Sequence, residues 1–415
     1  MKRGVSVSNT ALHTVLNTAH GSELEAALTA AATFTDLESP GTAQLLRKQF
    51  SAEVAAWALT QTDLRRKAAA KLGERAARMY FTPTGLEQAT RASVSDWRAA
   101  RIRELGVSGV IDLTAGLGAD AIAFLAAGLS VVAVERDAET AEYLAHNLSC
   151  FATAGIRAEV IVGDAVELVD TLHKTHSDYA IYLDPARRTA AGRSWKLSDL
   201  TPSWEFVTGL LADAAANAPA NPVIVKLAPG FPLSEIPTGV APCWVSDQGV
   251  LVELSLWPGT GRKAVVLRND AVHTLALSPQ EPTPPPPPAA APRAYLIEPD
   301  PAVIRSGLAP LLAAGLTALS PAVAYLSSDT PLDTPLASCF EVLEVLPFDM
   351  KALRSWVRIN NIGILEIKKR AVEIDPDALR KKLRPTGKRS ATLIISPTVS
   401  GVKVFSCRRV GTRLA

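Results

Sequence analysis

The chain has 415 residues, enough for two or three domains of ordinary size. Hydrophobic residues make up 48% and charged residues 20%, which is typical of globular proteins and excludes a fully disordered chain. The net charge is only +2, but residues 351–415 hold 16 Lys/Arg against 4 Asp/Glu, a local +12, so the rest of the chain carries −10. A basic segment behind an acidic body is typical of a module that binds a polyanion.

Cysteine and histidine usage excludes several classes of site. The cysteines are far apart and form no Cys-x-x-Cys pair, so the sequence predicts neither a zinc knuckle nor a disulfide framework. Scattered thiols suit a reducing cytosol. The six histidines form no metal set, the N-terminus lacks the apolar core of a signal peptide, and no apolar stretch is long enough to cross a bilayer. We therefore expect a cytoplasmic protein without a metal ion or a membrane partner.

Residues 1–105 are rich in Ala, Leu, Glu, Arg and Gln, which predicts an N-terminal helical region that packs as a layer. From residue 108, apolar runs alternate with helical stretches. The runs are VSGVIDL, SVVAVER, EVIVGD, AIYLDP and PVIVKLAP. Continuous apolar strands between helices indicate a parallel sheet covered on both faces. LVELSLW and KAVVLR flank PGTGR, which predicts a hairpin at the end of a domain spanning residues 106–277.

Residues 278–293 are rich in proline and include five consecutive prolines, Pro284 to Pro288. Such a run favours polyproline II, so we expect a semi-rigid linker. Residues 294–415 then predict a basic α+β domain. Its expected helices cover residues 301–315, 350–359 and 376–383. Asp375 followed by proline is a good start for the last helix, because the carboxylate caps exposed N–H groups.

Acidic residues end three of the predicted parallel strands. Asp112 ends the first and is followed by a turn with two glycines, which let backbone approach a ligand closely. Glu135 ends the second strand, where an acid accepts both hydroxyls of a ribose, and Asp164 ends the third, near an adenine. Because all three lie at the carboxyl edge of the sheet, they predict one ligand site. The predicted cofactor-binding residues are Asp112, Thr114, Ala115, Gly116, Gly118, Asp120, Glu135, Arg136, Asp164 and Ala165.

This constellation resembles the class I S-adenosylmethionine (SAM)-dependent methyltransferases over residues 106–270. The resemblance implies an α/β, Rossmann-like, seven-stranded sheet with its last strand antiparallel and SAM as the cofactor. It also implies that Asp112 and Gly116 lie near the methionine part of SAM. Gly116-x-Gly118-x-x-Ala121 also matches the dinucleotide fingerprint, so NAD-dependent redox chemistry stays open as an alternative.

Asp184-Pro185 ends the fourth strand, where amino-methylating enzymes carry a D/N-P-P-aromatic motif. The resemblance implies that Asp184 and Pro185 are catalytic, because the acid accepts a hydrogen bond from the target amine and orients it for in-line transfer. Here Ala186 replaces the second proline and Arg187 the aromatic residue. Arg187 and Arg188 are suited to grip a phosphate or to form an internal ion pair. Lys226, at the end of the fifth strand, is expected to be a structural or rim residue.

The DPARR sequence also resembles a bacterial group of methyltransferase-like proteins with a THUMP-like C-terminal domain. YFTPTGLEQAT (80–90), ILEIKKR (364–370) and IDPDALRKKL (374–383) extend this resemblance over most of residues 40–415. THUMP domains accompany enzymes that modify RNA, chiefly tRNA, so the resemblance implies an RNA partner.

The basic residues of the last domain cluster along the sequence. If these residues share one face, they would bind the phosphates of a nucleic acid with an affinity that depends on salt. The alternative is that the charged runs only face solvent. Few aromatics lie between them, which favours structured RNA recognised by its shape. The predicted RNA-binding residues are Arg187, Arg188, Lys368, Lys369, Arg370, Arg380, Lys381, Lys382 and Arg384.

The sequence thus predicts a SAM-dependent methyltransferase of tRNA or rRNA, acting at an exocyclic base nitrogen. Two other classes stay open: a methyltransferase of a small molecule or protein, and a non-catalytic RNA-binding protein with a methyltransferase fold.

Overall fold

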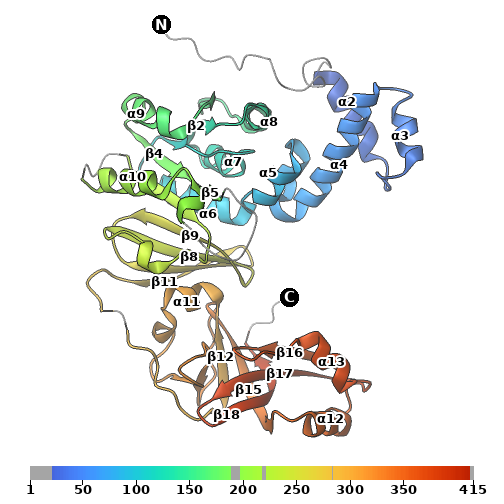
Figure 1. The fold of residues 1–415 in the computed structure, drawn as a ribbon, viewed down its shortest axis with the longest axis vertical. Coiled ribbons are helices and arrows are strands. Elements are labelled where there is room, and N and C mark those ends of the chain that lie inside the picture. The colour runs from blue at the N-terminus through green and yellow to red at the C-terminus, as the bar shows by residue number, and fades with distance from the viewer. Residues whose placement is uncertain (1–20, 188–196, 217–220, 283, 412–415) are drawn as a thin grey trace. The chain divides into compact units, whose positions relative to one another are not determined.

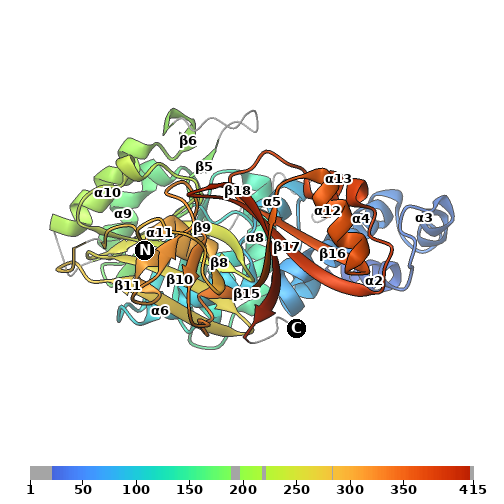
Figure 2. The ribbon, with the colours of Figure 1, turned by 90° about the horizontal axis from the view of Figure 1, so that it is seen from below.

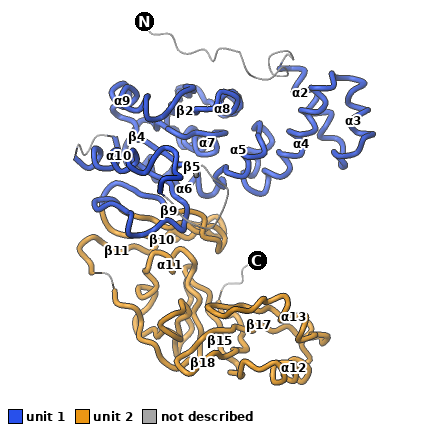
Figure 3. The backbone as a smooth tube through the Cα atoms, in the orientation of Figure 1, with its two compact units in different colours: residues 1–240, 255–259 blue, residues 241–254, 260–415 orange. Residues whose placement is uncertain are grey.

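The computed structural model describes residues 21–187, 197–216, 221–282 and 284–411. The chain divides into two compact units: residues 1–240 with 255–259 (unit 1) and residues 241–254 with 260–415 (unit 2), as Figure 3 shows. The domain boundaries expected from the sequence stay a prediction. Among the described residues, no helix is both long enough and apolar enough to cross a bilayer.

Unit 1 begins with a set of helices that we call the N-terminal layer. These are α2 (Gly21–Ala32), α3 (Pro40–Leu46), α4 (Ala52–Leu72), the short 3-10 helix η1 (Gly73–Arg78), α5 (Pro83–Gln88) and α6 (Ala92–Arg103). α4 begins after Ser51, whose side chain accepts a hydrogen bond from Val54 N at 3.2 Å. It ends at Gly73, whose φ of 59° suits glycine. The prediction of a helical N-terminal region is confirmed.

The next part of unit 1 alternates strands with helices. Its elements are β1 (Gly109–Asp112), α7 (Ala119–Ala126), β2 (Ser130–Glu135), α8 (Ala138–Phe151), β3 (Ala158–Val162), α9 (Ala165–Thr175), β4 (Tyr179–Leu183), β5 (Ala186–Arg187), β6 (Leu200–Thr201), α10 (Trp204–Ala216) and β7 (Val223–Leu227). All of β1 is buried, as expected for a parallel strand with both faces covered. α7 and α8 lie on one side of the strands, and α9 and α10 on the other (Figure 1). β1 pairs in parallel with β2 and β4, and Asp112 lies beside Tyr182 in the register.

Four more strands complete this sheet: β8 (Val240–Asp247), β9 (Val250–Pro258), β10 (Arg262–Arg268) and β11 (Ala271–Leu277). The strand order is β11-β10-β8-β9-β7-β4-β1-β2-β3. The seven apolar runs of the sequence correspond to β1, β2, β3, β4, β7, β9 and β10, and the sheet also contains β8 and β11, which were not expected. The predicted α/β fold class is therefore confirmed, with two strands more than expected.

The predicted hairpin across PGTGR is wrong. β9 and β10 are not neighbours, because β8 lies between them and pairs in parallel with β10. Two-residue turns close the hairpins elsewhere. Gln248 and Gly249 join β8 to β9, and Asn269 and Asp270 join β10 to β11, with positive φ at all four residues. Such turns match the twist of antiparallel strands, so they decide which strands pair.

Unit 2 also contains a second sheet of seven strands, in the order β13-β14-β12-β15-β18-β17-β16. Its strands and helices are β12 (Tyr295–Pro299), α11 (Pro301–Ser306), η4 (Ala309–Leu311), β13 (Thr317–Ala318), β14 (Leu326–Ser328), β15 (Ala337–Pro347), α12 (Met350–Ile359), β16 (Ile362–Lys369), α13 (Pro376–Leu383), β17 (Arg389–Thr398) and β18 (Gly401–Val410). The helix predicted over 301–315 is shorter than expected, because α11 ends at Gly307, whose φ is 74°. The other two predicted helices have the expected bounds. Asp375 caps α13 by accepting hydrogen bonds from Asp377 N and Ala378 N.

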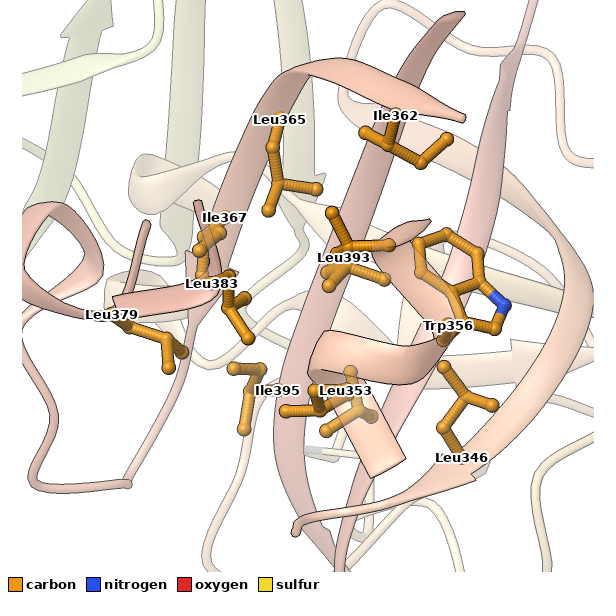
Figure 4. Close-up of a cluster of buried hydrophobic side chains, with 12 residues drawn as sticks. Leu346, Leu353, Trp356, Ile362, Leu365, Ile367, Leu379, Leu383, Leu393 and Ile395 are labelled. Atoms are coloured by element: carbon orange, nitrogen blue, oxygen red, sulfur yellow. The ribbon is translucent and has the colours of Figure 1, made fainter. Parts of the chain in front are cut away.

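α12 and α13 cover one face of this sheet (Figure 2). Figure 4 shows the apolar core beneath them. Leu353 and Trp356 of α12 and Leu379 and Leu383 of α13 pack on Leu393 and its neighbours from the strands. The residues on the opposite side of each helix face outward, and they determine the charge of this face.

Candidate active site

The loop after β1 gives a ligand room to approach the backbone. This glycine loop, residues 113–118, contains Gly116 and Gly118, whose φ angles are 54° and 86°. A Cβ added to Gly116 would meet no atom within 4 Å, so the space beside it is open. Gly118 precedes α7, whose first N–H groups lack partners within the helix. N–H groups at such a helix start bind anionic groups such as a carboxylate.

Glu135 ends β2 beside this loop. Its Oε2 accepts a hydrogen bond from Gly116 N at 3.0 Å, and its Oε1 accepts one from Asp137 N at 2.9 Å. The side chain is half-buried, and each carboxylate oxygen has a second lone pair. The backbone thus fixes an acid that can still accept hydrogen bonds from a pair of hydroxyls.

Asp112 is a buried acid, with 1% of its surface exposed. Its Oδ1 accepts a hydrogen bond from Thr114 N at 3.1 Å, and in the described part of the chain no cation forms an ion pair with it. Burial, followed by the charges of Asp120 and Asp184, raises its pKa well above the usual value. A cationic ligand at this edge would favour the carboxylate and so would bind with a gain in electrostatic energy.

The other predicted cofactor residues have different surroundings. Asp164 accepts a hydrogen bond from Val166 N at 2.8 Å and so caps α9, next to the buried Ala165. Arg136 is exposed. Thr114 Oγ1 accepts a hydrogen bond from the backbone N of Asp184 at 2.7 Å, which ties the glycine loop to the residue after β4. The loop residue Ala115 is also held, because its N donates to Val134 O at 3.0 Å.

Asp184 lies at the same sheet edge as Asp112. Its side chain is 34% exposed and forms an ion pair with Lys226 Nζ from the end of β7. The next residue, Pro185, is buried. The arrangement is a carboxylate that is oriented by an ion pair, accessible from solvent and close to the glycine loop.

Comparison with known proteins identifies the family of the chain. Two proteins from strains of Mycobacterium tuberculosis, both called uncharacterized S-adenosylmethionine-dependent methyltransferases, are each 32% identical to the chain over 375 residues, which is 85% of this chain and 97% of theirs. The chain belongs to their family. It is a SAM-dependent methyltransferase.

Two further comparisons extend this result to both units. The THUMP domain-like family matches residues 337–409 of the methyltransferase. A crystal structure of a protein assigned as a methyltransferase, from Porphyromonas gingivalis, has the same fold: its TM-score is 0.78 at 24% identity, and the match covers 94% of this chain and 99% of that one. The predicted THUMP-like methyltransferase family is thus confirmed.

SAM is the cofactor of the methyltransferase, and the residues at the edge fit it. SAM carries an ammonium and a sulfonium, which suit a buried acid without a cationic partner, and a ribose, which suits Glu135. When bound, it supplies an electrophilic methyl group. Among the described residues, no group of three or more His, Cys, Asp or Glu is arranged to hold a metal ion.

Asp120, expected to face the cofactor, faces the N-terminal layer instead. Its Oδ1 pairs with the buried Arg98, while its Oδ2 accepts hydrogen bonds from Thr90 Oγ1 at 2.7 Å and from Tyr182 OH at 3.1 Å. Protein groups thus contact both of its oxygens, and the expected contact of Asp120 with the cofactor stays a prediction. Its early position in α7 gave no sign of these partners, since they come from α6, β4 and the segment after α5.

The ammonium of Lys226, which we expected to be a structural or rim residue, contacts the carboxylate of Asp184. Sequence reasoning did not predict this contact, although β7 follows β4 as the next parallel strand and both residues come after buried strand positions. Arg187 lies in β5, and its side chain is not described; Arg188 lies outside the described residues.

The predicted RNA-binding residues of unit 2 separate into two groups. Lys368 Nζ and the Arg370 guanidinium lie 2.8 and 3.6 Å from the carboxylate of Glu298, so they form an internal cluster. The half-buried Arg380 pairs with Asp377 at 2.6 Å. The expected contact of these three residues with RNA stays a prediction. The exposed members of the predicted set are Lys369, Lys381, Lys382 and Arg384.

Proposed function

We propose that this methyltransferase acts in the cytoplasm on structured RNA, tRNA or rRNA, and transfers the methyl group to an exocyclic base nitrogen. The observation that carries the proposal is an exposed basic surface on the two helices of the THUMP-like region. We call it the basic helix face. Its members are Lys351, Arg354 and Arg358 of α12, and Lys381, Lys382 and Arg384 at the end of α13.

The basic helix face follows from the packing of the two helices. Their apolar sides are buried against the sheet, so their charged sides face solvent. Arg354 Nε donates a hydrogen bond to Lys382 O at 3.0 Å, which holds the two helices side by side. In the described part of the chain, none of the six cations forms an ion pair with an acid. Cations spread over a rigid surface are suited to follow a phosphate backbone.

The other face of the sheet has a different character. There Glu298 accepts a hydrogen bond from Tyr325 OH at 3.0 Å and pairs with Lys368 and Arg370. Glu298 thus offsets one of these two positive charges within the protein. This contrast supports the helix-covered face as the one that binds RNA.

The sheet edge of unit 1 supports the proposed reaction. Asp112, Gly116, Glu135 and Asp164 would hold SAM. The carboxylate of Asp184 would accept a hydrogen bond from the acceptor amine and aim its lone pair, while the buried Pro185 limits backbone movement. The Lys226 ammonium contacts the Asp184 carboxylate and orients it, so that it would stabilise the positive charge that develops on the attacking nitrogen.

The first test is transfer of labelled methyl from SAM to total RNA from cells that lack this gene. We expect label in a discrete RNA, and none with Asp184→Ala, whose SAM affinity should stay close to that of the wild type. Label in protein or in nuclease-resistant small molecules, with none in RNA, would contradict the proposal.

The second test addresses the basic helix face. Neutralising Lys381, Lys382 and Arg384 to Gln should lower the slope of log affinity for RNA against log salt by about 2 to 3, the loss expected for three phosphate contacts. The matched control neutralises Arg47, Lys48 and Lys174, exposed cations of unit 1, with the same change in net charge. An equal effect of both triple variants would mean that the protein attracts RNA only non-specifically, through its charge, and would refute RNA binding at the basic helix face.

A further inference from the structure

The N-terminal layer reaches the glycine loop through two buried polar clusters. The first is centred on Asp120. Its partner Arg98 has a fully buried side chain, and Thr90 and Tyr182 donate hydrogen bonds to the same carboxylate. A charge pair removed from water to this degree is costly to break, because the remaining partner is left without compensation. The cluster therefore resists displacement of the loop end at α7.

The second cluster is centred on Asn147 of α8, which is fully buried. Its Nδ2 donates to Leu117 O at 2.9 Å and to Tyr80 O at 3.0 Å, and its Oδ1 accepts from Tyr80 N at 2.7 Å. Leu117 belongs to the glycine loop, and Tyr80 to the segment between η1 and α5. One amide thus fastens the loop to the N-terminal layer.

Close packing supports the hydrogen bonds. A Cβ added to Gly85 of α5 would lie 2.4 Å from Leu117 Cδ1, a distance at which something must shift. Glycine at this position lets α5 rest directly on the loop. The two clusters and this contact hold the glycine loop at Leu117 and the start of α7 at Asp120, on either side of Gly118.

The same clusters extend to the acceptor side. Tyr182, which donates to Asp120, belongs to β4, and Asp184 is the first residue after this strand. The backbone N of Asp184 donates to Thr114 in the glycine loop. Hydrogen bonds, together with the short backbone segment from Tyr182 to Asp184, therefore connect the N-terminal layer, the loop beside the cofactor and the residue beside the acceptor. In-line transfer depends on such positioning, and a misplacement of 1 Å can cost about 100-fold in rate.

We infer that Arg98, Asp120 and Asn147 are positioning residues of the methyl transfer, and that the N-terminal layer is a working part of the catalytic unit. The inference rests on SAM-dependent activity alone and holds whichever acceptor is used. It assigns to the layer a role beyond covering the sheet.

The test measures SAM affinity by calorimetry at a temperature where each variant is fully folded, as judged by its thermal unfolding curve. Asn147→Asp keeps the acceptor for Tyr80 N but loses both donated bonds, and Arg98→Met leaves Asp120 without its cation. We expect the Kd for SAM to rise about tenfold or more in each, the scale of one or two lost hydrogen bonds. Hydrogen exchange of residues 113–120 should accelerate in parallel.

Two further variants make the result decisive. Arg66→Met removes hydrogen bonds to Ala32 O and Thr35 O within the N-terminal layer, away from the loop, so it should lower thermal stability without changing the Kd. If Arg98→Met fails to fold, Thr90→Val preserves shape while removing a single bond to Asp120, and should raise the Kd about threefold. A Kd within twofold of wild type in Asn147→Asp and Thr90→Val would overturn the inference, because the clusters would then serve stability alone.

Discussion

Asp300 is a buried acid that fastens α11 to the strands of the first sheet within unit 2, and its removal gives a stringent test of the fold. None of its side chain is exposed. Its Oδ1 accepts hydrogen bonds from Ser246 Oγ at 2.5 Å and from Ala302 N at 2.9 Å, and its Oδ2 lies 3.4 Å from the Arg268 guanidinium. β8, β10 and the start of α11 therefore depend on one carboxylate.

Asp300→Ala removes these contacts and leaves Arg268, which is 13% exposed, without its acid. Breaking a buried pair of this kind costs about 3–5 kcal/mol, which corresponds to a loss of amide protection of about 100- to 4,000-fold. Hydrogen exchange followed by mass spectrometry over β8, β10 and α11 measures this loss directly. Unit 1 should keep its protection.

Two comparisons sharpen the Asp300 prediction. Asp329→Ala removes an acid whose side chain is 76% exposed and pairs with Arg293, so it should change protection by less than about tenfold. Protection of β8 and β10 within threefold of wild type in Asp300→Ala would refute the argument. Burial raises the pKa of Asp300, so its contribution to stability is greatest below the ordinary carboxyl pKa and falls as pH rises through the raised value. Asp300→Asn should abolish this pH dependence.

Three other predictions concern the site and the cores. Because burial raises the pKa of Asp112, binding of cationic SAM should release a proton, and the affinity for SAM should rise with pH through that pKa by about one decade per pH unit at most. Calorimetry in buffers of different ionisation enthalpy measures the released proton. The Asp112→Asn variant should release none. Gly85→Ala should lower stability by about 1–3 kcal/mol in urea unfolding by displacing Leu117, whereas Gly41→Ala, whose Cβ would meet Ser39 Oγ at an ordinary 3.5 Å, should not. Leu353→Ala should cost about 2–5 kcal/mol by opening a cavity under α12, and a loss below 1 kcal/mol would mean that the core refills.

Local patterns in the sequence determined much of this protein. The apolar runs before Asp112, Glu135 and Asp184 predicted parallel strands, because strands buried on both faces must be apolar throughout. The helix after Asp375 had its predicted bounds, because a capping acid followed by proline fixes a helix start through neighbouring atoms alone. The acids at the strand ends could also be assigned to one edge of the sheet, because parallel strands all end on the same side.

Tertiary structure decided the features that depend on residues distant in the chain. Glycines favoured a hairpin at PGTGR, yet tight turns at Gln248 and Asn269 pair the strands differently, because register is a property of whole strands. Lys368 was predicted as part of a phosphate-binding cluster, and only the fold shows that Glu298 lies beside it. Asp120 was predicted as a ligand contact, and only the fold shows that Arg98 faces it. A charged side chain takes its role from the partner that the fold supplies, and that partner lies too far along the sequence for a local pattern to reveal.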